Sequence, residues 1–144
     1  MKNCTFFGHK NTTSHIKPLL KSTIIRLIED EDVDNFYVGK EGNFDFYVAQ
    51  VLKEIKATYP HINYSVVLAY LHKSADKDED YTDTIYPEGL EKVPPKFAIV
   101  KRNLWMIKNS DYVIAYVKAI GGAKQFMELA ESKGKVVINL ADLI

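Results

Sequence analysis

Three short glycine-containing segments, each placed directly after an apolar run, are the residues of this chain best suited to binding chemistry. They are residues 8–10 (Gly-His-Lys), 39–42 (Gly-Lys-Glu-Gly) and 121–122 (Gly-Gly). Glycine lets the backbone come close to a ligand, and the free N–H groups of a following helix attract an anion such as phosphate. A tight turn also uses glycine for structure alone, but three turns at one sheet edge predict a ligand crevice with anion character. The candidate ligand-binding residues at these turns are Gly8, Gly39, Gly42, Gly121 and Gly122.

The spacing within the turns differs from that of two common phosphate-binding loops. Residues 39–45 read Gly-Lys-Glu-Gly-Asn-Phe-Asp, which does not match a Walker A loop. The first turn lacks the Gly-x-Gly-x-x-Gly spacing of a dinucleotide-binding turn. The predicted crevice therefore depends on the convergence of the three turns.

Polar side chains beside the first two turns are further candidate ligand-binding residues. His9 either makes a structural hydrogen bond at the surface or contacts a ligand phosphate or ribose. Asn43 can cap the helix that follows the second turn. Asp45, in the first turn of that helix, either complements the helix dipole or holds a ribose hydroxyl. The remaining histidines are too scattered along the chain to indicate a metal site.

Apolar runs alternate with amphipathic segments, and this alternation predicts the elements that position the turns. Strands are predicted at residues 4–7, 35–39, 64–70, 112–117 and 135–139. Helices are predicted at residues 15–31, 43–59, 96–109 and 122–133. The pattern indicates an α/β fold, a Rossmann-like three-layer sandwich with a five-stranded, mostly parallel sheet of order 3-2-1-4-5. This order reverses between the first and fourth strands, which places the crevice above their C-terminal ends.

Residues 72–95 interrupt the alternation with a charged stretch that contains three prolines and two tyrosines. A connection of this length within a compact domain is usually functional or disordered. We interpret residues 76–80 as an acidic, solvated loop, and residues 85–95 either as part of the connection or as a lid over the site. No internal repeat or second-domain boundary is visible, so residues 1–144 are predicted to form a single domain.

Composition limits the partners that the chain is expected to have. Its 144 residues are 47% hydrophobic and 26% charged, with 19 basic and 19 acidic side chains. Sequence-independent binding to nucleic acid or an anionic membrane usually needs a basic excess, so neither partner is expected, although a local basic pocket is compatible with this balance. The single cysteine, Cys4, allows no internal disulfide. Because we find no signal-peptide core and no apolar run of about 20 residues, we expect a cytoplasmic protein.

The second half of the chain contains an ordered series of potentially functional residues. Arg102 and Asn103 are followed by Met106, by Ser110-Asp111 and the apolar strand, and then by Gly121-Gly122 and Glu128. This order resembles the pattern of the SLOG superfamily, which includes the LOG (lonely guy) phosphoribohydrolases and the YpsA-like proteins. The stretches Thr-Phe-Phe-Gly-His-Lys and Val-Gly-Lys-Glu-Gly-Asn-Phe-Asp-Phe are most similar to the YpsA-like branch, whose members have no settled activity.

The resemblance implies roles for two residues. In LOG enzymes the matching arginine and glutamate act in cleaving the N-glycosidic bond of a nucleoside monophosphate, and the glycine turns hold the phosphate. Carried over, Arg102 would orient or charge-stabilise the ribosyl phosphate, and Glu128 would act on the ribose or the attacking water. A carboxylate suits this chemistry because glycosidic cleavage passes through an oxocarbenium-like state.

The chain also departs from the LOG pattern around its third turn. Ile120 replaces the proline before the two glycines, and Lys124-Gln125 replaces the Gly-Thr of the phosphate loop. Lys124 can still contribute positive charge to a phosphate and is a candidate ligand-binding residue. These departures favour ligand binding over catalysis.

Three functional hypotheses remain open from the sequence. The first is binding of a nucleotide or nucleotide-derived ligand, of the NAD, ADP-ribose or nucleoside phosphate class, without an assigned cofactor. The second is an N-glycosidic hydrolase or ribosyl transferase that acts on nucleoside monophosphates through Glu128 and Arg102. The third is a non-catalytic interaction module. The resemblance also implies a homo-oligomer.

Overall fold

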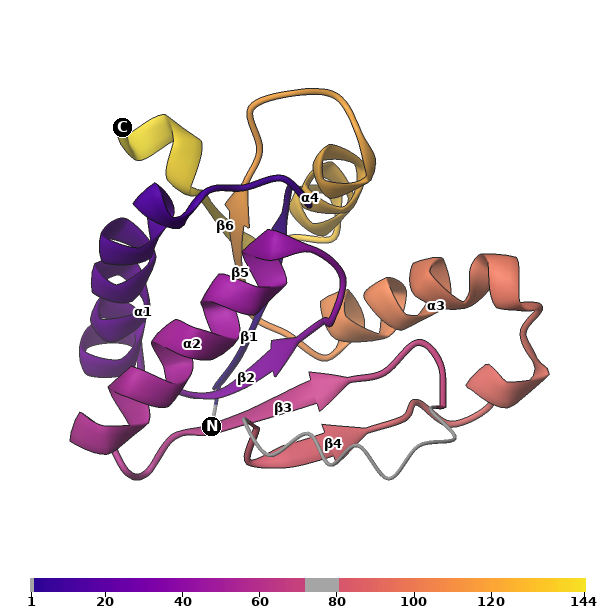
Figure 1. The fold of residues 1–144 in the computed structure, drawn as a ribbon, viewed down its shortest axis with the longest axis horizontal. Coiled ribbons are helices and arrows are strands. Elements are labelled where there is room, and N and C mark those ends of the chain that lie inside the picture. Colours follow the sequence, from indigo (N-terminus) through magenta and orange to yellow (C-terminus); the bar gives the residue numbers. More distant parts are fainter. Residues whose placement is uncertain (1, 72–80) are drawn as a thin grey trace.

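One parallel β-sheet with helices on both faces forms the protein (Figure 1). The computed structural model describes residues 2–71 and 81–144. The sheet has six strands in the order β4-β3-β2-β1-β5-β6. In chain order the strands are β1 (Lys2–Gly8), β2 (Val33–Val38), β3 (Asn63–Val67), β4 (Asp83–Ile85), β5 (Tyr112–Tyr116) and β6 (Val136–Asn139). The helices are α1 (Lys17–Glu31), α2 (Asn43–Thr58), α3 (Pro95–Lys108) and α4 (Gly122–Ser132), with short 3₁₀ turns η1 (Ser14–Ile16), η2 (Leu90–Lys92) and η3 (Leu140–Leu143).

The hydrophobic core lies on both faces of the sheet because successive strand residues point to opposite sides. Phe6 on β1 belongs to the cluster that packs against α1 and α2, where Ile24 and Leu52 are buried. The next residue, Phe7, belongs to the cluster under α3 and α4, with Met106 as a buried member. The central strand β1 therefore holds the two helical layers in place, and its C-terminal end emerges between them.

The predicted α/β sandwich with a parallel sheet is confirmed, but the sheet has six strands where five were expected. The predicted order 3-2-1-4-5 corresponds to β3-β2-β1-β5-β6. The additional strand, β4, lies at the edge beside β3 and pairs with it in parallel, with Ser65 opposite Asp83. A three-residue strand is too short to show a hydrophobic period, so only its pairing partner defines it.

The segment that we interpreted as a long connection contains β4 and η2. Residues 72–80, which include the acidic stretch predicted as a solvated loop, lie outside the described residues. From Asp83 the chain follows the sheet edge, and Leu90 in η2 is buried. No helix in the described part of the chain is long and apolar enough to cross a membrane.

The first two glycine turns pack directly against each other. The backbone N–H of Asn43 donates a hydrogen bond to the carbonyl of Lys10, with an N–O distance of 2.9 Å. A Cβ atom on Gly8 would lie 2.2 Å from Cγ of Phe44, and one on Gly42 would lie 2.6 Å from Cα of Lys10. Gly42 also has a φ of +90°, which favours glycine. Steric contact between the turns therefore requires glycine at both positions.

We predict that Gly8→Ala lowers the free energy of unfolding by about 1–3 kcal/mol, because its methyl group would overlap the fully buried ring of Phe44. Urea unfolding followed by circular dichroism measures the change. Gly122→Ala is the matched control, since a Cβ there would meet no atom within 4 Å. It should change stability by less than about 1 kcal/mol. Equal losses in both variants would contradict this steric explanation.

Candidate functional site

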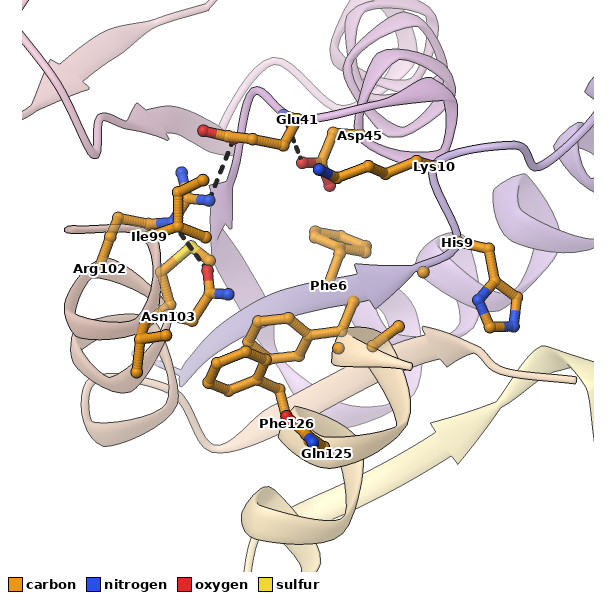
Figure 2. A pocket seen from close by; sticks show the side chains of 16 residues that line it. Phe6, His9, Lys10, Glu41, Asp45, Ile99, Arg102, Asn103, Gln125 and Phe126 are labelled. Carbon is orange, nitrogen blue, oxygen red and sulfur yellow. Dashed lines mark hydrogen bonds and ion pairs between the residues drawn. The ribbon is translucent and has the colours of Figure 1, made fainter. Parts of the chain in front are cut away.

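A cavity of about 430 Å³ opens at the C-terminal edge of the sheet (Figure 2). We call it the central cavity. Its walls come from the end of β1 and the loop after it, the turn between β2 and α2, the middle of α3 and the first turns of α4. These are the segments that the glycine turns were predicted to bring together. Such a volume suits a small ligand, because ligand pockets usually measure about 300–1,000 Å³.

Arg102 on α3 is the main polar group of the wall, although its side chain is only 2% exposed. Its Nη1 donates to the carbonyl of Val67 at 2.8 Å, which ties α3 to the end of β3. Its Nη2 donates to Oε2 of Glu41 at 3.1 Å, which ties α3 to the turn after β2. A guanidinium carries five N–H groups. These two bonds and the Nε contact to Asn103 use three of them, so two have no acceptor among the residues that the structure describes.

Asn103, which is 8% exposed, has a fixed orientation because of Arg102. The Nε of Arg102 can only donate, so the group that receives its hydrogen bond at 2.8 Å is the Oδ1 of Asn103. The Nδ2 group must therefore face the other way. Figure 2 shows it directed into the cavity, where no protein acceptor among the described residues contacts it. An amide donor that is aimed into a cavity from an otherwise buried residue is suited to an oxygen or nitrogen acceptor on a ligand.

Two carboxyl groups lie beside Arg102 in the cavity wall, those of Glu41 and Asp45. Oδ2 of Asp45 accepts a hydrogen bond from the backbone N–H of Glu41 at 2.9 Å. Burial raises the pKa of Asp45 from 3.8 to about 7, while the Glu41 N–H and the positive charge of Arg102 oppose the rise. Gly39 lies behind this group, and a Cβ on it would come within 2.8 Å of Oδ2 of Asp45 and 3.2 Å of both terminal nitrogens of Arg102.

An apolar surface completes the cavity. The rings of Phe7 and Phe126 stack with centroids 5.5 Å apart and an angle of 22° between their planes. Ile99 and Val100 on α3 also line the cavity, and Val100 is 44% exposed. The cavity therefore combines an aromatic and aliphatic wall with a cluster of hydrogen-bonding groups, the composition expected of a site for a planar polar ligand.

The first turn of α4 also faces the cavity. Gly122 lines it, and a Cβ on Gly121 or Gly122 would meet no protein atom within 4 Å. These two glycines therefore leave open space, in contrast to the packed glycines at positions 8 and 42. The unpaired N–H groups at the start of a helix attract an anion.

His9 makes structural hydrogen bonds at the edge of the cavity. Its Nε2 accepts hydrogen bonds from the backbone N–H groups of Lys118 and Ala119, at 2.9 and 3.3 Å. Backbone N–H groups can only donate, so the proton of the neutral ring sits on Nδ1. His9 thus connects the loop after β1 to the loop after β5. His9 thus makes a structural hydrogen bond, and it also lines the cavity, while its contact with a ligand phosphate or ribose stays a prediction.

Sequence comparison identifies the family. The model of the YpsA family, described as the YspA SLOG family, matches residues 2–135. The chain belongs to this SLOG family. The resemblance noted in the sequence is thereby confirmed. A UPF0398 protein from Brevibacillus brevis is similar over 139 residues at 23% identity, covering 88% of this chain and 73% of that protein.

The SLOG fold of this chain is also similar to a solved structure of DNA processing protein A from Helicobacter pylori. The TM-score is 0.63 at 14% sequence identity, with 94% of this chain covered. This chain spans only 63% of the length of that structure, which is described for its single-stranded DNA binding mode. At this identity the likeness establishes the shared fold.

This likeness corrects one expectation from the sequence. We expected no nucleic-acid partner because the net charge is zero, but this fold also occurs in a protein that binds single-stranded DNA. Net charge sums over the whole chain and says nothing about local positive groups such as Arg102, Lys10 and Lys118. The exclusion of nucleic acid was therefore wrong.

The structure brings together about half of the site residues that the sequence indicated. Those that line the central cavity are Gly8, His9, Asp45, Arg102 and Gly122. Those placed outside its lining are Gly39, Gly42, Asn43, Gly121, Lys124 and Glu128. Glu128 is exposed on α4, away from its predicted partner Arg102 in the cavity. Among the described residues, none of positions 81–95 lines the cavity, so the part of the predicted lid that the structure describes does not cover it.

Sequence reasoning missed several lining residues. Lys10 and Glu41 lie inside the glycine turns that it identified, so their position in the turns was an available signal. Asn103 and Phe126 lie on helices, where only the rotation of the helix decides which side chains face the cavity. In the described part of the chain, no three His, Cys, Asp or Glu side chains form a metal-binding group.

The raised pKa of Asp45 predicts a specific pH dependence of stability. The folded chain holds a proton on Asp45 up to about pH 7, whereas the unfolded chain releases it near pH 4. Asp45 therefore does not reduce the free energy of unfolding below pH 4, where it is protonated in both states. As the pH rises from 4 to 7, the unfolded state is favoured because only there does the carboxyl ionise freely, so the free energy of unfolding falls. Asp45→Asn should remove the loss, so that the variant gains about 1–3 kcal/mol relative to wild type between pH 4.5 and 8.

Urea unfolding at several pH values tests this prediction. Asp30→Asn, which changes an exposed carboxylate on α1, is the matched control and should keep the wild-type pH dependence. An unchanged pH dependence in Asp45→Asn would show that its carboxyl is not perturbed.

Proposed function

We propose that this SLOG-family chain binds a nucleotide or nucleotide-derived ligand in the central cavity. The observation that carries the proposal is the pair Arg102 and Asn103. Both side chains are more than nine-tenths buried, and both have N–H groups that no protein acceptor in the described structure uses. A ligand acceptor that replaces solvent at these donors would gain hydrogen bonds, each worth about 0.5–1.5 kcal/mol.

The remaining walls suit the other parts of a nucleotide. Phe126 and Val100 offer an apolar surface against which a planar base can pack. Asp45 offers a carboxyl group to a ribose hydroxyl. Gly122 at the start of α4, together with Lys10 on the facing loop, offers N–H groups and positive charge to a phosphate. No single wall points to a nucleotide, but their combination within about 430 Å³ supports this class of ligand.

N-glycosidic cleavage receives less support from the geometry. The sequence-based hypothesis paired Arg102 with Glu128, and Glu128 lies outside the cavity lining. The carboxyl groups beside Arg102 are those of Glu41 and Asp45. Base release from nucleoside monophosphates is still a direct assay. Release that vanishes in Glu128→Gln would support the hydrolase hypothesis, and release that vanishes only in Asp45→Asn would assign the reaction to the cavity carboxyl.

Isothermal titration calorimetry with AMP and ADP-ribose tests the binding proposal, with a short oligothymidylate as a nucleic-acid probe. The decisive variant is Asn103→Asp, which keeps the acceptor for Arg102 but replaces the inward N–H donor with a second carboxylate oxygen. We predict at least about a tenfold loss of affinity for AMP, because the amide hydrogen bond to the ligand is lost and the new carboxylate repels both the ligand acceptor and the negatively charged phosphate.

Gln50→Glu is the matched control, because it adds the same charge on α2 outside the cavity lining and should leave affinity unchanged. Absence of binding by every probe would overturn the proposal and leave the interaction module as the remaining hypothesis. The cytoplasmic location and the homo-oligomer stay predictions.

A further inference from the structure

A second cavity of about 480 Å³ lies on the other side of His9. The loop after β1 supplies one wall, with Thr13 and His15, and the loop after β5 supplies the other, with Lys118. We call it the outer cavity. His9 lines both cavities, so the two adjoin at this residue. Figure 2 shows His9 at the side of the central cavity opposite Arg102 and Asn103.

The outer cavity occupies the position at which this fold class most often binds ligands. Strands β1 and β5 are parallel neighbours, yet the helices that follow them, α1 and α4, pack on opposite faces of the sheet. The loops after the two strands therefore diverge and leave a crevice between them. In open α/β sheets, ligands bind at such a switch point.

The polar groups of the outer cavity are held in place around a buried tyrosine. Tyr116 is 3% exposed, and its hydroxyl lies 3.2 Å from Nε2 of His15. The rings of His9 and His15 both stand edge-on to the Tyr116 ring, with centroids 6.4 and 5.9 Å away. His15 also contacts the hydroxyl of Thr13 through Nδ1. The Nε2 of His9 accepts hydrogen bonds from the backbone of the facing loop, so its Nδ1–H is the group that can donate to a ligand.

The charge balance distinguishes the two cavities. In the central cavity, Arg102 pairs with Glu41, and the positive charge of Lys10 acts on Asp45. In the outer cavity, Nζ of Lys118 lies 5.7 Å from the centre of the Tyr116 ring. Within the described residues Lys118 forms no ion pair, and no acidic side chain lines this cavity. An unopposed ammonium beside imidazole and hydroxyl donors attracts an oxyanion.

We propose that the outer cavity binds a second phosphoryl group of the ligand. The ligand is then a nucleotide extended through a phosphate link, as in a dinucleotide-type molecule with a pyrophosphate, rather than a mononucleotide. Its nucleoside part occupies the central cavity, and its extension passes His9 towards Lys118 and His15. This inference rests on the proposed function, because it assigns the ligand class of the same site.

The test compares AMP with ADP-ribose by isothermal titration calorimetry. Wild type should bind ADP-ribose at least about tenfold more tightly than AMP, since a charge-assisted contact contributes about that factor. Lys118→Ala should remove most of this advantage and leave AMP affinity unchanged. Lys118→Arg should keep it. Because His9 bonds to the backbone of residue 118, these substitutions leave that contact in place.

Lys108→Ala, an exposed lysine at the far end of α3, is the matched control and should affect neither ligand. His15→Ala should act in the same direction as Lys118→Ala, because it removes the ring that holds the hydroxyls of Thr13 and Tyr116 in place at the outer cavity.

The outcomes separate this inference from the proposed function. If AMP binds and ADP-ribose binds no more tightly than AMP, the outer cavity does not bind a phosphoryl group and only this inference fails. If Lys118→Ala weakens AMP and ADP-ribose equally, the lysine acts on the central cavity and the inference also fails. If Lys118→Ala weakens only an oligothymidylate, the outer cavity belongs to a nucleic-acid strand and the small-molecule assignment is overturned. If neither AMP, ADP-ribose nor the oligothymidylate binds, the proposed function itself fails.

Discussion

The buried guanidinium of Arg102 is the interaction on which the site depends. It joins the end of β3, the turn after β2 and α3 through hydrogen bonds to Val67, Glu41 and Asn103. A buried charge is tolerated only when it is paired and hydrogen-bonded, so these segments must keep their relative positions. The same bonds orient Asn103 and leave donors facing the cavity. One side chain thus fixes both the architecture of the crevice wall and its hydrogen-bonding character.

The glycine turns divide into two kinds with different physical tasks. Gly8 and Gly42 allow two turns to pack on each other, where a Cβ would overlap Phe44 or the backbone of Lys10. Gly121 and Gly122 face open space at the start of α4. The first kind builds one rim of the crevice, and the second kind keeps the opposite rim accessible. Conformational freedom alone does not distinguish them, but the atoms that surround each glycine do.

Much of the fold followed from local sequence patterns, whereas the composition of the site did not. Buried strands such as Tyr112–Tyr116 were predictable because a continuous apolar run can only lie between two covered faces. The edge strand Asp83–Ile85 was not predictable, because its three residues show no pattern of their own and only their pairing with β3 makes them a strand. The location of the site was predictable, because the turns that follow parallel strands all lie at one edge of the sheet. The pairing of Arg102 with Glu41 was not predictable, because 61 residues separate them in the chain.

The sequence by itself determined the α/β layers, the edge at which the crevice lies, the family and the presence of Arg102 in the site. Periodicity, glycine positions and motif order carry this information locally. Only the tertiary structure decided that Arg102 faces Glu41 and Asp45 in the cavity while Glu128 stays outside it on α4. The reason is that the rotation of a helix about its axis depends on how it packs on the sheet. The unopposed charge of Lys118 beside His9 and His15 likewise depends on two loops meeting at the switch point.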